Sequence, residues 1–314
     1  MELAPEFVLC AVNSLFLPES LPTFIAQHVS REETELAARF GQIQPILVAP
    51  SNAGAGYVIQ GGILHFLALK RAGLTNIFCR ITGETASPQA AFALRILHEQ
   101  PACQSSPILQ ALLIKAMDGF LPLAEQLSLL PLMGLKAQQH VLAERLSLLQ
   151  LNSAVQEALH TQELHSKNIN LLARLPAEEQ KHLVELISRY HLRGSKQQKL
   201  VELMVELHLR DGSTVSSLLA EWQESEPPQD NLPQESQNLL NFLFNRYNPR
   251  VIQAEQRFHE QVRGLQAPAG VNITHTPAFE DEAVTVQLSY SSWAKLQAQW
   301  PHLLKLTETG NPDR

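Results

Sequence analysis

The chain has no long apolar run, no paired cysteines and no overall excess of basic residues. No stretch of about 18 apolar residues occurs among its 314 residues, which excludes a membrane-spanning helix. The first ten residues contain two glutamates and neither Lys nor Arg, so we expect no secretory signal and a cytoplasmic location. Cys10, Cys79 and Cys103 are far apart and form no CxxC pair. We therefore expect reduced, buried thiols rather than a disulfide framework or a zinc site.

Charge is distributed unevenly over a chain whose formal net charge is −7. Basic residues number 6 against 8 acidic ones in residues 1–100, 10 against 8 in residues 101–200, and 8 against 15 in residues 201–314. A polyanion responds to the charge of one face rather than of the whole chain. The acidity of the whole chain argues against nucleic-acid binding, whereas the middle third, the one third with a positive balance, is compatible with it.

Residues 1–87 alternate between strand-like and helix-like patterns. Short apolar runs are typical of strands, and Ser30 followed by Glu33 marks the start of a helix. The expected strands are Phe7–Val12, Leu47–Ala49, Tyr57–Gln60 and Asn76–Ile81, and the expected helices are Glu32–Phe40 and Gly62–Ala72. This order predicts a small mixed α/β domain.

The remaining residues predict a helical domain, a linker and a small C-terminal domain, which makes the fold class α+β. Residues 88–223 have helical periodicity with breaks at Pro101–Pro107, Pro131–Gly134, Asn152, Pro176 and Gly194. Residues 224–233 (ESEPPQDNLP) are rich in proline and acidic residues, as linkers are. In residues 234–314 the expected elements are helices Gln234–Tyr247, Arg250–Leu265 and Ser292–Leu306 and strands Val271–Thr276 and Ala283–Tyr290.

Two segments of the N-terminal domain resemble the ParB partition-protein family, including its RepB and Noc relatives. Residues 35–37 (ELA) followed by 41–48 (GQIQPILV) are similar to the family's eLA…GxIQPIxV stretch. Tyr57–Gly73 (YVIQGGILHFLALKRAG) has the position of its next strand–turn–helix segment. Together with the helical part described below, the resemblance covers most of residues 8–222. It implies a ParB/sulfiredoxin-like fold for residues 1–87.

The resemblance implies CTP as a ligand of this domain. In the family, Glu and Arg residues at the turn help to hold the phosphates of a cytidine nucleotide, whereas this chain has Gly62, Ile63 and Leu64 there. Free N–H groups at a helix start can still bind an anion, and a purely structural turn is the alternative. The nucleotide-binding positions implied by the resemblance are Gly41, Gln44, Gly61 and Gly62.

The family's third nucleotide motif, ENxQR, falls on residues 94–106 (LRILHEQPACQSS), where its Asn and Arg are missing. With two of three motifs altered, we expect the CTP switch to be weakened or lost. No cofactor is predicted from the residues themselves. A CTP-binding or CTP-hydrolysing DNA clamp is a second alternative, and any residual CTPase activity is implied by the resemblance alone.

Residues 123–159 resemble the family's helix-turn-helix region. Leu123–Leu132, Gly134, a helix over Lys136–Leu149 and then Leu151–Leu159 follow in the family's order. Lys, Gln, His and Arg on the outer face of such a helix are suited to phosphates and base edges in a major groove. An ordinary solvated helix is the alternative. The expected DNA-binding residues are Lys136, Gln138, Gln139, His140, Arg145, Lys167, Arg193, Lys196 and Lys199.

Two further groups of residues have open interpretations. The cluster at residues 193–199 either grips backbone phosphates or lies near a helix C-terminus, where positive charge stabilises the helix dipole. C-terminal regions of the family commonly dimerise, so a homodimer is expected, although a domain core explains the same apolar residues. These residues are Leu239, Leu240, Phe242, Leu243, Phe244 and Tyr247.

No catalytic residues and no metal site are predicted. The motifs GxSxG and HExxH are absent, and the twelve histidines occur singly along helices. Sulfiredoxin-like redox chemistry at Cys79 and a metal-dependent nuclease are disfavoured rivals. We expect a ParB-like DNA-binding protein at the nucleoid, in plasmid or chromosome partition or in transcriptional control, with a partition ATPase as an implied partner. A non-catalytic protein-interaction scaffold on the same fold is the alternative.

Overall fold

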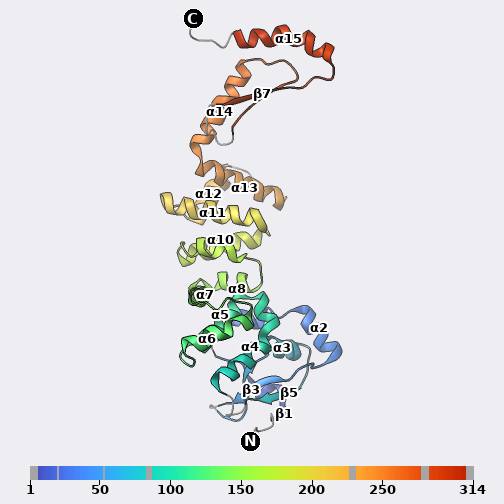
Figure 1. Ribbon diagram of the computed structural model, residues 1–314, viewed down its shortest axis with the longest axis vertical. Helices are drawn as coiled ribbons and strands as arrows, with labels where there is room; N and C mark the ends of the chain where they lie inside the picture. The colour runs from blue at the N-terminus through green and yellow to red at the C-terminus, as the bar shows by residue number, and fades with distance from the viewer. Residues whose placement is uncertain are drawn as a thin grey trace. The chain divides into compact units, whose positions relative to one another are not determined.

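The computed structural model describes residues 6–19, 21–51, 54–82, 87–225, 231–276 and 283–308. The chain divides into two compact units, Met1–Leu219 and Ala220–Arg314. The expected α+β class is confirmed, because a five-stranded sheet is followed by a long run of helices and by a two-stranded sheet between helices (Figure 1). The domain boundaries at residues 87/88 and the linker at residues 224–233 stay predictions.

The first unit contains a mixed sheet of strand order β1-β5-β3-β4-β2. The strands are β1 (Phe7–Ala11), β2 (Leu15–Phe16), β3 (Ile46–Pro50), β4 (Tyr57–Gly61) and β5 (Asn76–Ile81). β5 runs antiparallel to β1 and parallel to β3, and β4 runs antiparallel to β3 and parallel to β2. All four expected strands are present, and β2 is an addition that follows the short η1 (Val12–Ser14).

Helices pack on both faces of the central strands. α1 (Thr23–Gln27), α2 (Arg31–Phe40) and α3 (Ile63–Arg71) cover one face, with Phe66 and Ile59 fully buried between the layers. α4 (Pro88–Ser105) contacts β4. Because both faces are covered there, Ile46, Leu47 and Val48 in β3 are all completely buried.

Local signals in the first unit act as expected. The Ser30 hydroxyl accepts the N–H of Glu33 at 3.3 Å and starts α2, and Gly41, at φ 72°, ends it. Cys10 and Cys79 are free and buried as expected, and burial raises the pKa of Cys79 to about 12. The side chain of Cys103 lies outside the described residues.

The helical part continues from α4 to α12. Its elements are α5 (Pro107–Met117), α6 (Leu123–Leu129), η2 (Leu130–Met133), α7 (Gln139–Ser147), η3 (Leu148–Gln150), α8 (Ser153–His160), η4 (Ser166–Asn168), α9 (Ile169–Leu172), α10 (Ala177–Arg189), α11 (Gly194–Asp211) and α12 (Val215–Ser225). The predicted breaks are present, although α4 passes through Pro101 and ends at Ser105. Among the described helices, none combines the length and the apolar composition needed to span a bilayer.

The helix predicted over Lys136–Leu149 is shorter than expected. Gly134 adopts a left-handed conformation, and the N–H of Gln138 donates to the carbonyl of Lys136 at 2.8 Å. Gln138 itself is extended, so the helix begins at Gln139. Lys136 and Gln138 therefore lie in the segment before α7 rather than on the helix.

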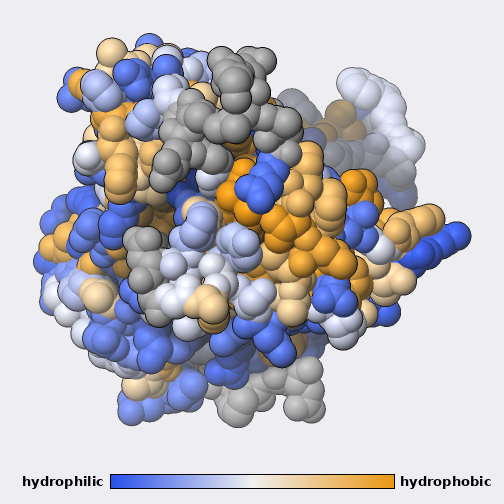
Figure 2. Space-filling view, turned by 90° about the horizontal axis from the view of Figure 1, so that it is seen from below, coloured by the Kyte–Doolittle hydropathy of each residue, from blue (hydrophilic) through white to orange (hydrophobic). Residues whose placement is uncertain are grey.

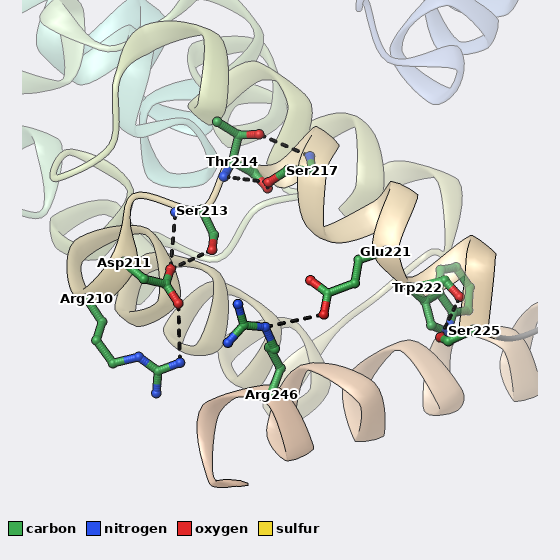
Figure 3. Close-up of polar contacts among 9 residues, drawn as sticks. All are labelled: Arg210, Asp211, Ser213, Thr214, Ser217, Glu221, Trp222, Ser225 and Arg246. Atoms are coloured by element: carbon green, nitrogen blue, oxygen red, sulfur yellow. Dashed lines mark hydrogen bonds and ion pairs between the residues drawn. The ribbon is translucent and has the colours of Figure 1, made fainter.

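Short polar contacts define the turn between α11 and α12 (Figure 3). The Asp211 carboxylate accepts the N–H of Ser213 at 3.2 Å. Thr214 Oγ1 accepts the N–H of Ser217 at 3.0 Å, and Ser217 Oγ accepts the N–H of Thr214 at 2.9 Å. Such reciprocal capping satisfies the free N–H groups of a helix start, which is why α12 begins here.

The second unit comprises helices around a hairpin. After the end of α12 come α13 (Leu232–Tyr247), α14 (Pro249–Gly264), the antiparallel strands β6 (Val271–His275) and β7 (Val284–Leu288), and α15 (Trp293–Glu308). Leu239, Leu240 and Leu243 are buried in this unit. Arg246 Nε lies 3.4 Å from a carboxylate oxygen of Glu221, an ion pair that joins α13 to the end of α12 (Figure 3).

Candidate nucleic-acid interface

The polar residues expected to contact DNA are exposed around the start of α7. Lys136 and Gln138 precede the helix, Gln139 and His140 open it, and all four side chains face solvent. α7 packs on α5 and η3, yet none of its residues is fully buried. Because free N–H groups and polar side chains gather at one helix start, this surface can donate to an anion and to base edges. We call these four residues the α7 group.

Arg145, also expected to contact DNA, is held against the protein. Its side chain is 18% exposed, and its Nε–H donates to Oε1 of Gln110 at 3.0 Å. Gln110 is buried, and its amide nitrogen donates to the carbonyl of Met133 at 3.1 Å. Arg145 thus ties α7 to α5, and its 3.4 Å ion pair with Glu144 at the surface adds little. The sequence analysis missed Gln110, whose signal is a polar residue in an otherwise apolar helix.

A second set of the residues expected to bind DNA lies around the start of α11. Lys167 lies in η4, Arg193 immediately precedes α11, and Lys196 and Lys199 lie in its first two turns. All four side chains are exposed. The Nη1 of Arg193 donates to the carbonyl of Gln162 at 3.4 Å. We call these four residues the α11 group.

A buried glutamine brings the parts of the α11 group together. Gln197 is 1% exposed and makes four hydrogen bonds. Its Oε1 accepts the N–H of His165 and the amide of Asn168, both at 2.9 Å. Its Nε2 donates to the carbonyls of Glu163 at 2.7 Å and Leu192 at 2.9 Å. The loop that carries Lys167 is therefore fixed against the first turn of α11, which no local sequence pattern predicted.

The position of this cluster overturns one of the two interpretations given to it. α10 ends at Arg189, so Arg193 and Lys196 lie at the N-terminus of α11 rather than at a helix C-terminus. The positive end of the helix dipole lies there, and positive side chains reduce helix stability at that end. The dipole therefore does not explain these residues, whereas a bound polyanion would compensate both charges.

A hollow of about 620 Å³ lies beside the α11 group. Its wall combines the end of α8, the loop before η4 and the start of α11, with polar groups from Gln162, His165, Ser166 and Arg193. Glu163 also lines it, and its carboxylate accepts the hydroxyl of Ser188 at 2.7 Å. The hollow is open to solvent, has both polar and apolar groups in its wall and lies next to the cationic side chains of the α11 group.

The positions implied for a nucleotide lie at the end of α2, in the segment before β3 and at the turn between β4 and α3. Gly61 and Gly62 are adjacent and buried at the end of β4 and the start of α3, whereas Gln44 is exposed before β3 and Gly41 ends α2. Gly62 has φ 81°, and a Cβ there would lie 3.1 Å from Ile46. The glycine is thus required by the backbone conformation and the close packing of the turn.

A carboxylate lies where a phosphate would be held at this turn. Glu99, from α4, is 5% exposed and accepts the N–H of Ile63 at 2.7 Å. Burial raises the pKa of Glu99, while hydrogen bonds from Ile63 and Gly62 and the charge of Arg95 oppose that rise. Burial also lowers the pKa values of nearby His65 and His98, which favours their neutral forms. The turn is therefore occupied by the chain's own acid, and the residues present do not fit a phosphate. Sequence reasoning missed Glu99 because its partner lies 36 residues away.

Comparisons with known proteins found resemblance in solved structures. No protein-family model and no curated protein sequence matches the chain. A C-terminally truncated ParB from Caulobacter crescentus complexed to the centromeric parS site matches with 23% identity over 62% of this chain and 97% of that chain, at a TM-score of 0.32. The same protein complexed with CTP-gamma-S matches with 23% identity over 58% of this chain and 99% of that chain, at a TM-score of 0.25. Both of these matched structures are of ParB.

Proposed function

We propose that this chain is a ParB-like DNA-binding protein that acts at the nucleoid, in plasmid or chromosome partition or in transcriptional control. The observation that carries this proposal is the exposed α7 group at the start of a helix that follows α6 and the turn at Gly134. In a helix-turn-helix, residues at the start of the second helix contact base edges in the major groove. The amides of Gln138 and Gln139 suit adenine, and Lys136 suits guanine or a phosphate.

The α11 group supplies the backbone contact in this proposal. Its side chains are exposed, and two of them, Arg193 and Lys196, place positive charge at the N-terminus of α11. Phosphate contacts fix the position of a protein on the duplex, whereas base contacts select the sequence. The α7 group is therefore assigned to sequence recognition and the α11 group to affinity.

Substitution of Lys136 tests the contact at α7. Duplexes selected by the wild-type protein from a random pool supply the binding site. For Lys136→Gln we expect the slope of log affinity against log salt to fall by about 0.9, as for the loss of one phosphate contact. For Gln139→Ala we expect a loss of about 1–3 kcal/mol in discrimination between the selected site and its single-base variants. Fluorescence anisotropy over a salt series measures both quantities.

Lys70→Gln is the matched control, because Lys70 is an exposed lysine on α3. Its salt slope should equal that of the wild type. If Lys136→Gln also keeps the wild-type slope, α7 does not meet DNA. A wild-type protein that retards no duplex at low salt would instead support the scaffold alternative.

We further propose that the CTP switch is weakened. The buried Glu99 carboxylate already accepts the N–H of Ile63 at the start of α3, and a phosphate there would lose that donor and face a like charge. Isothermal titration calorimetry with CTP should therefore show no micromolar binding to the wild-type protein. Glu99→Gln removes the charge and keeps an acceptor oxygen, so this variant should bind CTP more tightly than the wild type does. Micromolar binding of CTP by the wild type would contradict the proposal.

A homodimer is part of the proposal, and the hairpin of the second unit supports it. Val284, Val286 and Leu288 lie on one side of β7 and are 41–57% exposed. An isolated two-stranded hairpin is marginally stable, and additional strands that cover its apolar side stabilise it. A second copy would supply them. A partition ATPase remains a proposed partner by resemblance alone.

A further inference from the structure

One half of the N-terminal sheet presents an apolar face to solvent. Phe7 and Leu9 of β1 and Phe78 of β5 are 46%, 68% and 46% exposed, whereas the alternate residues Cys10 and Ile77 point into the core. The rings of Phe7 and Phe78 stack with centroids 5.3 Å apart. Figure 2, which views this end of the molecule, shows an apolar area over the sheet. We call Phe7, Leu9 and Phe78 the β1 patch.

The neighbouring loop extends the β1 patch. The amide of Gln42 bonds both backbone groups of Phe78, at 2.6 and 2.7 Å, and the next residue, Ile43, is 73% exposed. Since a phenylalanine side chain has roughly 150–250 Å² of surface, the β1 patch leaves roughly 300 Å² of apolar surface uncovered. Patches of that size on a monomer often mark interaction sites. A stable interface needs about 800 Å² per partner, so this surface suits a weak, reversible contact.

β1 is also an unprotected edge of the sheet. In the described residues its sheet neighbour is β5 alone. The N–H of Ile81 donates to the carbonyl of Glu6, and the N–H of Val12 donates to that of Thr75. Antiparallel pairing alternates, so the backbone groups of Phe7 and Leu9 point away from β5. Natural edge strands are usually protected by charged residues or proline, and Phe7–Ala11 (FVLCA) has neither.

We propose that β1 pairs antiparallel with β1 of a second copy of this chain. With a twofold axis at Leu9, Leu9 lies opposite its own copy and Phe7 lies opposite Ala11. No charged side chain in Phe7–Ala11 meets its like across that axis, so the strand is self-complementary. The outward N–H and C=O groups of Phe7 and Leu9 form the new ladder, and the two β1 patches join into one apolar stripe. This contact is independent of DNA binding and of the hairpin in the second unit.

A disulfide at the axis tests the proposed register. In a hydrogen-bonded antiparallel pair the two Cα atoms are about 5.5 Å apart, which suits a disulfide because its Cα–Cα range is about 4.4–6.8 Å. Leu9→Cys in the full chain should therefore form covalent dimers under mild oxidation. Glu32→Cys, at an exposed position on α2, and the wild type are the controls and should form few. Equal cross-linking of Leu9→Cys and Glu32→Cys would overturn the proposal.

Sedimentation velocity over a concentration series tests how strongly two chains associate through β1. Leu9 is exposed, so Leu9→Lys should keep the fold. The substitution places two lysines opposite each other across the proposed axis, so the association of two chains through β1 should weaken at least tenfold. Glu32→Lys should keep that association. Anisotropy with duplex DNA should be the same for Leu9→Lys and the wild type, which separates this contact from the proposed function. Unchanged self-association of Leu9→Lys would show that another partner, or none, covers the β1 patch.

Discussion

Replacement of Arg193, Lys196 and Lys199 by glutamine is expected to weaken binding to duplex DNA roughly 10²-fold near 0.1 M salt, because each phosphate contact adds about 0.9 to the salt slope. The slope itself should fall by up to about 2.7. Binding isotherms at four or more salt concentrations measure it. The free energy of unfolding should be unchanged or slightly higher, since two of these charges oppose the dipole at the start of α11.

A variant with equal charge change separates local contacts from net charge. Lys70, Arg250 and Lys295 are exposed and lie on α3, α14 and α15, so their joint replacement by glutamine removes the same charge elsewhere. This control should change the salt slope far less. Equal slopes for the two triple variants would show that the α11 group makes no specific contact with the duplex.

Replacement of Gln197 by alanine is expected to lower the free energy of unfolding of the first unit by about 2–6 kcal/mol, since two of its four hydrogen bonds are buried and each buried polar group left unsatisfied costs about 1–3 kcal/mol. The variant leaves the His165 N–H, the Asn168 amide and two carbonyls without their partner. Urea denaturation followed by far-ultraviolet circular dichroism measures the loss. Affinity for DNA should fall as well, because Lys167 is no longer held beside α11.

Two further substitutions accompany this experiment: a control at the neighbouring residue and a second change at Gln197. Gln198→Ala removes an exposed side chain whose bond to Glu202 lies at the surface, so it should cost no more than about 0.5 kcal/mol. Gln197→Glu keeps the volume and the acceptor but loses both donated hydrogen bonds, so it should also be strongly destabilising. A Gln197→Ala protein within about 1 kcal/mol of the wild type would mean that these four bonds do not hold the loop.

Local chemistry allowed much of the first unit to be predicted. β5 has the predicted bounds Asn76–Ile81, Ser30 begins α2 as expected, and Gly41 ends it. These outcomes depend on residues within a few positions of one another: a hydroxyl near a free N–H, a glycine at positive φ, and alternating apolar side chains. The sequence predicted the start of α7 too early, because helical periodicity extends back to Lys136. In the structure Gly134 is left-handed and Gln138 is extended, so the helix begins at Gln139.

The candidate site was predicted as a set of residues but not as an arrangement. The exposed α7 group and the basic residues of the α11 group were all named from the pattern and the resemblance. Arg145 was named too, and its bond to Gln110 decides that its guanidinium packs inward. Charge and polarity are visible in a sequence, whereas the direction of a long side chain depends on which acceptor lies within reach.

The order of residues by itself determined the type of most helices and strands and the caps of several helices, since these follow from interactions over three or four residues. Tertiary structure decided the rest: the strand order that leaves β1 at an edge, the carboxylate of Glu99 at the start of α3, and the four bonds of Gln197. Apart from the bond between Gln197 and Leu192, each of these joins groups about 30 or more residues apart. Such contacts form only when the core has packed, because burial is what makes a buried polar group require those particular partners.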